Sequence, residues 1–360
     1  MKILFVTSDL DGGGIERLLF NYCVRLRSDA QFDFAITASK EGLLEQPLKE
    51  LGCKIFRIST IHNSLATHNR QLKEIMMNGN YDIVHDHGGY CGLFTMILAK
   101  RCGIKIRIEH SHRSFESENL FQKIKRKMIT VLTRHYATDL FACGIDAGKW
   151  MWGNAKNVHV MKNAINTKAF LFDDIARKDI RRQLGIDNKF LIGNVARFGI
   201  EKNHCFLLNV FAKICETRKD AVLLLVGTGE LLSEMKQLAN ELRIIDNVLF
   251  LGIRSDVHRL LNAMDVFVLP SLHEGLPVSL VEVQANGLEA FVSDSVTREV
   301  QMLQNCHYLP LEKGYSFWAE QISSASFNRC TEITEVLKYD IENTSKDLLQ
   351  HYKLLIKKRA

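Results

Sequence analysis

Two carboxylates, Glu274 and Glu282, lie eight positions apart in the segment HEGLPVSLVEVQANG (273–287). The apolar run MDVFVLPS (264–271) before them predicts a buried parallel strand, and Pro277 suits the first turn of a helix that follows it. Glu274 would then lie in the loop at the carboxyl end of the strand, and Glu282 about five residues into the helix. Because the N–H groups of a first helical turn attract anions, this order of groups suits a sugar, a diphosphate and a ribose.

A second candidate is the cationic loop ARFGIEKNH (196–204), which follows the apolar run FLIGNVA (190–196). Arg197 and Lys202 are suited to hold two phosphates, the guanidinium as a fork and the ammonium as a point charge. An ordinary solvated basic loop is the alternative. The position of the loop after a strand, in the same half of the chain as the two glutamates, favours anion binding.

The segment GGGIER (12–17) follows the first apolar run, KILFVTS (2–8), and begins a helical pattern. Glycines at such a point let backbone N–H groups come close to a diphosphate. The spacing is not G-x-G-x-x-G, so we do not expect a nicotinamide dinucleotide site. A plain turn between a strand and a helix is the alternative.

Histidines follow two of the predicted strands, in HDHGG (85–89) and IEHSHRS (108–114). A histidine at the end of a strand is suited to acid/base work or to binding a sugar hydroxyl, although lone histidines are more often structural. We take His112 as the first candidate and His110 as the second. The two short motifs offer no clear third and fourth ligand, so we expect no metal site.

The stretch LFQKIKRKMITVLTRHYA (120–137) is basic and amphipathic. Its basic residues are Lys123, Lys125, Arg126, Lys127 and Arg134, and its apolar ones include Phe121, Ile124, Met128, Ile129 and Leu132. It is either a surface helix with its apolar face turned inward or a helix that docks on an anionic membrane surface. Nucleic acid is not favoured, because no aromatic stacking platform or reading helix accompanies the charge.

Short apolar runs alternate with helical patterns along the whole chain. They lie at 2–8, 32–37, 54–59, 82–87, 105–110 and 138–143, and again at 190–196, 221–227, 247–252, 265–270, 289–294 and 307–311. This alternation predicts an α/β protein with two Rossmann-like, doubly wound parallel sheets. The pattern weakens over 163–187, so we expect domains at 1–165 and 166–340. The C-terminal segment 341–360, part of a helical pattern that begins near 329, would pack back on one of them, the N-terminal domain in the first instance.

Composition is that of a globular protein: 360 residues, 46% hydrophobic and 24% charged, with a net charge of +6. The nine cysteines occur singly, without a C-x-x-C pair, which argues against a disulfide framework or a zinc ribbon. The short apolar run at the N-terminus is a strand rather than a signal peptide, and no apolar stretch approaches the ~18 residues of a membrane span. We therefore expect a cytoplasmic protein, with possible attachment to the inner membrane face.

The chain resembles, nearly from end to end, the retaining GT-B glycosyltransferases of family 4, and among them the bacterial branch that builds capsule and exopolysaccharide. The resemblance rests on the following motifs: GGGIERLLFN, YDIVHDHG, EHSHRS, CGIDAGKWMWG, NAIN, NVARFGIEKNH, LLLVGTGE, the long block NVLFLGIRSDVHRLLNAMDVFVLPSLHEGLPVSLVEVQANG, and SDSVTREV. The most specific feature of the resemblance is the pair of glutamates in that block together with the Arg–Lys loop that precedes it in the sequence.

The resemblance implies two Rossmann-like domains that face a cleft, with the acceptor side in 1–165 and the donor nucleotide-sugar site in 166–340. It implies that Arg197 and Lys202 hold the donor diphosphate. Gly13 and Gly14 would line the diphosphate from the other domain, and Gly227 would belong to the donor site. Such enzymes need no metal or other cofactor for donor binding, because the cationic loop does what magnesium does elsewhere.

The resemblance also implies roles at the sugar and the ribose. Glu274 would bind the hydroxyls of the donor sugar, and the amides of Gly275 and Leu276 would lie beside sugar and phosphate. Glu282 would accept hydrogen bonds from the ribose diol, and His112 would be the histidine beside the reacting centre. Four positions depart from the usual pattern without removing any of these groups: Ala196, Val283, Glu289 and Asn166.

The expected activity is transfer of a sugar, with retained anomeric configuration, from a UDP-sugar to a hydroxyl acceptor such as a lipid-linked glycan intermediate. Two alternatives remain. A nucleotide-sugar epimerase of the same fold would act without an acceptor, but it would need a clearer set of acid/base carboxylates. An inactive scaffold subunit is opposed by the intact set of Arg197, Lys202, Glu274 and Glu282.

Overall fold

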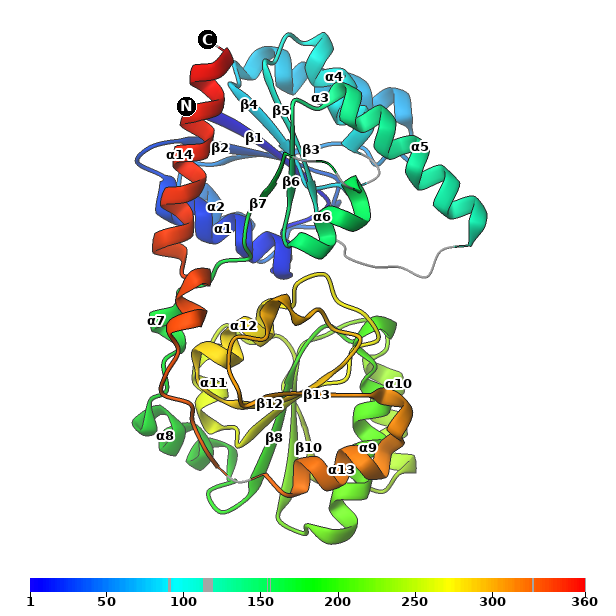
Figure 1. Cartoon of the computed structure of the whole chain (residues 1–360), viewed down its shortest axis with the longest axis vertical. Helices are drawn as coiled ribbons and strands as arrows, with labels where there is room; N and C mark the ends of the chain where they lie inside the picture. Colours follow the sequence, from blue (N-terminus) through cyan, green and yellow to red (C-terminus); the bar gives the residue numbers. More distant parts are fainter. Residues whose placement is uncertain (90–91, 113–118, 154, 156, 326, 360) are drawn as a thin grey trace. The chain divides into compact units, whose positions relative to one another are not determined.

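The computed structural model divides the chain into two compact units, which we call unit 1 (Met1–Ile165 and Tyr339–Ala360) and unit 2 (Asn166–Lys338) (Figure 1). The structure describes residues 1–89, 92–112, 119–153, 155, 157–325 and 327–359. Two residues of the motif IEHSHRS, Arg113 and Ser114, lie outside the described residues.

Unit 1 is a parallel sheet flanked by helices. Its strands are β1 (Lys2–Thr7), β2 (Gln31–Ile36), β3 (Lys54–Arg57), β4 (Ile83–Asp86), β5 (Ile106–Ser111), β6 (Asp139–Ala142) and β7 (Val158–Val160), in the order β3-β2-β1-β4-β5-β6-β7. Its helices are α1 (Gly14–Leu26), α2 (Glu45–Glu50), α3 (Leu65–Gly79), α4 (Gly92–Arg101), α5 (Leu120–Tyr136), α6 (Ile145–Trp152) and α14 (Ile341–Arg359). The sequence predicts every one of these strands except β7, whose residues, VHV, do not form an apolar run.

Unit 2 repeats the architecture. Its strands are β8 (Phe190–Val195), β9 (Ala221–Val226), β10 (Val248–Phe250), β11 (Val266–Leu269), β12 (Glu289–Ser293) and β13 (Cys306–Leu309), in the order β10-β9-β8-β11-β12-β13. Its α-helices are α7 (Thr167–Phe170), α8 (Asp174–Leu184), α9 (His204–Thr217), α10 (Leu232–Glu241), α11 (Val257–Ala263), α12 (Val278–Ala285) and α13 (Gly314–Ser323). Short 3₁₀ helices include η2 (Ile200–Lys202) and η6 (Thr334–Tyr339). The predicted pair of doubly wound parallel sheets is therefore confirmed.

The sequence pattern is misleading in two places. The segment 163–187, where the sequence pattern weakens, contains two helices, α7 and α8. The start of α8 is marked by a side-chain cap from Asp173 and not by an apolar repeat, so the pattern does not indicate it. Arg177 and Arg181 on α8 instead bind the buried carboxylate of Asp265, so a polar face points inward. The start of the C-terminal helix is also predicted too early. The sequence pattern places it near 329, whereas α14 begins at Ile341.

Helix α14 belongs to unit 1, where it lies beside α1 (Figure 1). Leu348, Tyr352 and Leu355 on this helix are buried in the hydrophobic core that β1, β2 and α1 form. Burial of side chains of this size stabilises a fold by about 1.5–3 kcal/mol each. The C-terminal segment is therefore an integral part of unit 1.

Each sheet has one point at which the chain order of its strands reverses. In unit 1 this switch point lies between β1 and β4, and in unit 2 between β8 and β11. Loops that leave the carboxyl ends of strands at a switch point diverge and leave a crevice, which is where open α/β sheets bind ligands. The candidate residues after β1, β8 and β11 all lie at these points.

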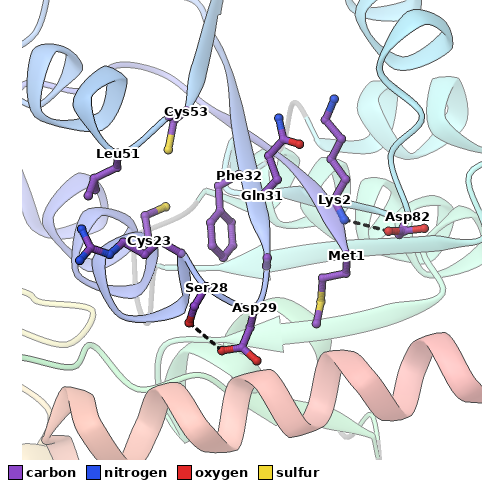
Figure 2. A pocket seen from close by; sticks show the side chains of 13 residues that line it. Met1, Lys2, Cys23, Ser28, Asp29, Gln31, Phe32, Leu51, Cys53 and Asp82 are labelled. Atoms are coloured by element: carbon purple, nitrogen blue, oxygen red, sulfur yellow. Dashed lines mark hydrogen bonds between the residues drawn. The ribbon is translucent and has the colours of Figure 1, made fainter.

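A hollow of about 510 Å³ in unit 1 lies elsewhere (Figure 2). Met1, Lys2 and Gln31 lie at the beginnings of β1 and β2, and Asp82, which precedes β4, accepts a hydrogen bond from the backbone of Lys2 at 2.8 Å. The hollow is therefore at the amino ends of the strands, away from the switch-point loops, and we do not assign the site to it. Among the described residues, no helix is long and apolar enough to cross a membrane.

Candidate active site

Two backbone-anchored contacts join the loops after β8 and β11 in unit 2. The N–H of Leu272 donates to the carbonyl of Glu201 at 2.8 Å, and the amide nitrogen Nδ2 of Asn203 donates to the carbonyl of Pro270 at 3.1 Å. Asn203 has a φ of 55°, a left-handed conformation that asparagine tolerates better than most residues. The cationic loop and the glutamate loop therefore hold each other in place.

The cation and the carboxylate at the centre of these loops form an ion pair. Lys202 Nζ lies 2.5 Å from Glu274 Oε1, and the hydroxyl of Ser271 donates to the same oxygen at 2.8 Å. The two charged side chains are only 20% and 8% exposed. Partial burial weakens solvent screening, so this pair is stronger than a fully exposed one.

Arg197 begins the same loop directly after β8 but is much more exposed, at 62%. Its guanidinium pairs with Glu201 at 2.9 Å and with Glu230 at 3.6 Å. Contacts between exposed groups are worth little, about 0–1 kcal/mol. An anion with several negative oxygens would compete for this guanidinium at small cost.

Glycines of the loop after β9 bring that loop against the backbone of Arg197. Gly227 has a φ of 140°, and a Cβ there would lie 2.0 Å from the carbonyl oxygen of Ala196. Gly229 likewise leaves room for the backbone of Phe198, whose N–H donates to Thr228 at 2.9 Å. Only glycine fits this close approach, so Gly227 positions the Arg197 loop.

Helix α12 begins one residue later than the sequence pattern suggests. Pro277 is its N-cap with extended backbone rather than a residue of the first turn, and Val278 is the first helical residue. Gly275 and Leu276 lie in the loop before it, and Glu282 is the fifth residue of the helix and is half-buried. The predicted positions, Glu274 in the loop and Glu282 about five residues into the helix, are confirmed.

The glycine loop after β1 surrounds a carboxyl that the sequence analysis overlooked. Gly13 is the N-cap of α1 and Gly14 its first residue. Glu16 is buried, and its carboxyl accepts a hydrogen bond from the N–H of Gly13. Burial, with smaller repulsion from Asp9 and Asp11, raises the pKa of Glu16 to about 7. The G-x-x-E spacing of a capping box is the signal that would have found it.

The histidines after β4 and β5 form one cluster in unit 1. His85 and His87 alternate with Asp86 along β4, and His110 and His112 follow the same period on the adjacent β5, so all four rings lie on one face of the sheet. His87 Nδ1 and His112 Nε2 are 2.8 Å apart. Burial lowers the pKa of His112 to about 3, so its ring is neutral near pH 7 and offers one donor and one acceptor.

Comparison with known proteins decides the family. The family model described as "Glycosyl transferases group 1" matches residues 176–307. The putative glycosyltransferase EpsF of Bacillus subtilis (strain 168) is 33% identical over 336 residues, which cover 90% of this chain and 88% of EpsF. The chain belongs to the group 1 glycosyltransferases. The resemblance of the motifs to those of glycosyltransferases is thereby confirmed.

Two further likenesses are informative about this glycosyltransferase. The UDP-Gal:alpha-D-GlcNAc-diphosphoundecaprenol alpha-1,3-galactosyltransferase of Escherichia coli is 27% identical and covers 75% of the chain and 73% of that enzyme. The crystal structure of Anabaena Alr3699/HepE in complex with UDP-glucose matches with a TM-score of 0.83 and 18% identity, over 98% of this chain and 99% of HepE. The second likeness confirms the predicted GT-B fold.

The matched family segment of the glycosyltransferase contains the whole candidate site of unit 2. Arg197, Lys202, Gly227, Glu274 and Glu282 all lie between residues 176 and 307. The unit 1 candidates, Gly13, Gly14 and His112, lie outside that segment but inside unit 1 at the carboxyl ends of β1 and β5.

Helix α5 of the glycosyltransferase turns its apolar residues outward. Its buried residues are Thr130 and Thr133, whereas a row of large apolar side chains is exposed: Leu120, Phe121, Ile124, Met128, Val131 and Leu132. Arg126 donates to the carbonyl of Trp150 at 2.7 Å and lies over its ring, which ties α5 to α6. The interpretation of this segment as a surface helix with an inward apolar face is therefore wrong.

Proposed function

We propose that this glycosyltransferase moves a sugar from a UDP-sugar to a hydroxyl of a lipid-linked glycan, in the cytoplasmic synthesis of a surface polysaccharide. The observation that carries the proposal is the Lys202–Glu274 pair beside Arg197 at the switch point of unit 2. Two similar proteins give support. The structure of HepE contains UDP-glucose, and the Escherichia coli enzyme is a galactosyltransferase with UDP-Gal as donor and a diphosphoundecaprenol-linked acceptor.

The proposed chemistry depends on charge that develops on the leaving diphosphate. As the bond to the sugar breaks, negative charge gathers on the oxygens nearest to Arg197, Lys202 and the beginning of α12. Donors already fixed at that place stabilise the transition state without reorganisation, and one such donor is worth about 3–4 kcal/mol. Electrostatic stabilisation is therefore the main catalytic contribution that we assign.

The other donor groups take the remaining parts of the nucleotide sugar. Glu274, with the loop of Gly275 and Leu276, binds the hydroxyls of the sugar, and Glu282 accepts hydrogen bonds from the ribose diol. Glu274 is a hydroxyl clamp and not a covalent nucleophile, because it already holds Lys202 and Ser271 through one oxygen. Gly227 lets the loop after β9 pack against the Arg197 loop, and so holds that loop in the position in which it binds the donor.

Unit 1 supplies the second set of groups in this proposal. Gly13 and Gly14 line the diphosphate, and His112 is a hydrogen-bonding partner beside the reacting centre. The neutral ring of His112 suits this role, since a neutral imidazole both donates and accepts. The transfer retains the anomeric configuration of the sugar.

Donor binding in this proposal requires no metal ion or other cofactor. The cationic pair of Arg197 and Lys202 neutralises the diphosphate, as Mg²⁺ does in other classes. Transfer should therefore proceed at its full rate in the presence of EDTA. A loss of activity that Mg²⁺ restores would contradict this part of the proposal.

Helix α5 gives the glycosyltransferase a surface for an anionic membrane. Phe121 is 75% exposed, and the apolar row is accompanied by Lys123, Lys125 and Lys127. Basic residues near an anionic surface contribute about 1 kcal/mol each. We expect sedimentation with phosphatidylglycerol vesicles but not with phosphatidylcholine vesicles, and about tenfold weaker binding for Phe121→Ser. Met77→Ser, at an exposed side chain on α3 outside this apolar row, is the matched control. An equal loss of binding in both variants would contradict a role of α5 in membrane binding.

The experiment that tests the function is an assay with a UDP-sugar panel and a diphosphoundecaprenol-linked sugar in detergent. The proposal predicts a glycosylated lipid whose new bond has the anomeric configuration of the donor. Epimerised UDP-sugar formed without acceptor would favour the epimerase. Binding of no UDP-sugar together with no product would favour the scaffold.

A further inference from the structure

We propose that the buried cluster of His85, His87 and His110 in unit 1 is a site for one transition-metal ion of the kind that prefers imidazole, such as Zn²⁺. One ring nitrogen from each of these three buried side chains lies within 4.8 Å of the other two. The two short motifs show no clear third and fourth ligand in the sequence, so the sequence alone predicts no metal site. Pairing of β4 with β5 brings His110 to the two histidines of HDHGG and supplies a third ligand.

The strand register brings the ligands together. His85 is paired with Ile108 and Asp86 with Glu109, so His110 follows one step beyond the end of β4, beside His87. His85 Nε2 and His110 Nδ1 are already 3.2 Å apart. Two ligands on a tetrahedral Zn²⁺ are separated by about 3.3 Å, given Zn–N distances of about 2.0–2.1 Å. A small inward movement of His87 would complete a three-nitrogen site.

One ring nitrogen in the cluster faces the proposed ion without another partner. His87 Nε2 is buried and has no hydrogen-bond partner among the residues that the structure describes. A buried polar atom without a partner costs about 1–3 kcal/mol. A metal binds the neutral form of an imidazole, through the lone pair of its unprotonated nitrogen.

The outer contacts of the rings match those of metal ligands. Histidines that bind a metal through one nitrogen usually hydrogen bond through the other. His85 Nδ1 is 2.8 Å from the hydroxyl of Tyr352 on α14, and His87 Nδ1 is 2.8 Å from His112 Nε2. His85 and His87 can therefore each donate the Nδ1 proton outward and present Nε2 to the ion.

A change of tautomer at His110 lets the site bind the ion without a net release of protons. Before binding, His110 donates its Nδ1 proton to His85 Nε2 across the 3.2 Å contact. On binding, His110 changes to its Nε2–H tautomer, so that its Nδ1 and His85 Nε2 both face the ion. No net proton is released, and the ion keeps a fourth position for solvent. We assign the site a role in the stability of unit 1.

Zinc binding to the whole chain tests this proposal directly. After equilibration with buffered Zn²⁺ and removal of excess ion, we expect about one Zn²⁺ per chain, and a tetrahedral visible spectrum when Co²⁺ is used. His85→Gln should lower the affinity at least 100-fold. Tyr352→Phe keeps the ring but removes the outer hydroxyl and should lower it 10–100-fold.

Substitution at another histidine pair provides the control. His351 stacks on His159 with ring centroids 3.9 Å apart, and His351→Gln should leave Zn²⁺ affinity unchanged. The proposal is overturned if the wild-type chain binds no stoichiometric Zn²⁺, or if His351→Gln weakens binding as much as Tyr352→Phe does. If His85→Gln fails to fold by circular dichroism, unchanged affinity in a folded Tyr352→Phe also overturns it. All readouts are of metal binding, so they do not depend on transfer activity.

Discussion

Lys202 and Glu274, which are 72 residues apart in the chain, form an ion pair with Nζ and Oε1 2.5 Å apart. The two residues to which we assign opposite ends of the donor reaction, phosphate and sugar, therefore neutralise each other. Ser271 holds the same carboxylate oxygen, so Glu274 is fixed from two sides. We expect a nucleotide sugar to draw Lys202 toward its phosphates and leave Glu274 facing the sugar.

Replacement of Lys202 by Met should lower kcat by about 10²–10³, because one fixed donor to the leaving group is lost. Glu274 would also lose its ion-pair partner while only 8% exposed, so the free energy of unfolding should fall by about 1–3 kcal/mol. Initial rates and urea unfolding measure the two effects. Lys213→Met is the control, since Lys213 pairs with Glu216 on the surface; equal rate losses in both variants would contradict the role of Lys202.

Replacement of Glu274 by Gln keeps the size of the side chain but removes its charge. The sugar hydroxyls then lose a charged acceptor, and we expect kcat/KM to fall by about 10–100-fold, as hydrogen bonds to charged groups are worth about 1.5–3 kcal/mol. UDP alone should bind at least as well as before, since Lys202 is no longer held by a carboxylate. Glu234→Gln on the exposed face of α10 is the control. Full turnover by Glu274→Gln would rule out the clamp.

Replacement of Gly227 by Ala should disturb the Arg197 loop. The new Cβ would lie 2.0 Å from the Ala196 carbonyl oxygen at a φ of 140°, so both contact and conformation are unfavourable. We expect a loss of stability above the roughly 1–3 kcal/mol of a strained backbone alone, together with weaker UDP binding. Gly185→Ala shares a positive φ but has open space around the added atom. Calorimetry of both variants should show weaker UDP binding only for Gly227→Ala. Unchanged UDP binding by this variant would mean that Gly227 has no role in the donor site.

The raised pKa of Glu16 makes stability depend on pH. Its folded-state pKa of about 7 exceeds the ordinary value of 4.5, so the folded state holds the proton more tightly. The stabilising contribution is complete below pH 4.5 and is lost as the pH rises through 7. Glu16→Gln keeps the contact to Gly13 without a charge and should be more stable than the wild type by about 3 kcal/mol at pH 8, at 1.36 kcal/mol per pKa unit.

Urea unfolding at pH 4.5 and pH 8 measures this difference. The advantage of Glu16→Gln should be small at the lower pH and largest at the higher one. Glu50→Gln, at an exposed carboxyl at the end of α2, should show no such change between the two values. An equal effect of Glu16→Gln at both pH values would mean that its carboxyl does not titrate in this range.

Much of the fold follows from local patterns, because each strand of a covered parallel sheet is a short apolar run and each switch-point loop is polar. Such patterns predicted every strand but β7 and placed Glu274 and Glu282 correctly on a loop and a helix. They failed at α8, where Arg177 and Arg181 face a buried aspartate. They also could not reveal contacts between distant residues, such as Tyr352 with His85, since periodicity carries no information on tertiary pairing.

We propose that unit 2 binds a UDP-sugar through its cationic loop without a metal ion. A thermal-shift panel of UDP-, GDP- and ADP-sugars in EDTA tests this most directly, with the wild-type chain beside Lys202→Met. A ligand at 100 times its Kd stabilises by about 2.7 kcal/mol, so we predict a clear upward shift of the midpoint with a UDP-sugar and a much smaller one in the variant. No shift with any of the three nucleotide sugars would contradict the proposal that unit 2 binds such a donor without a metal ion.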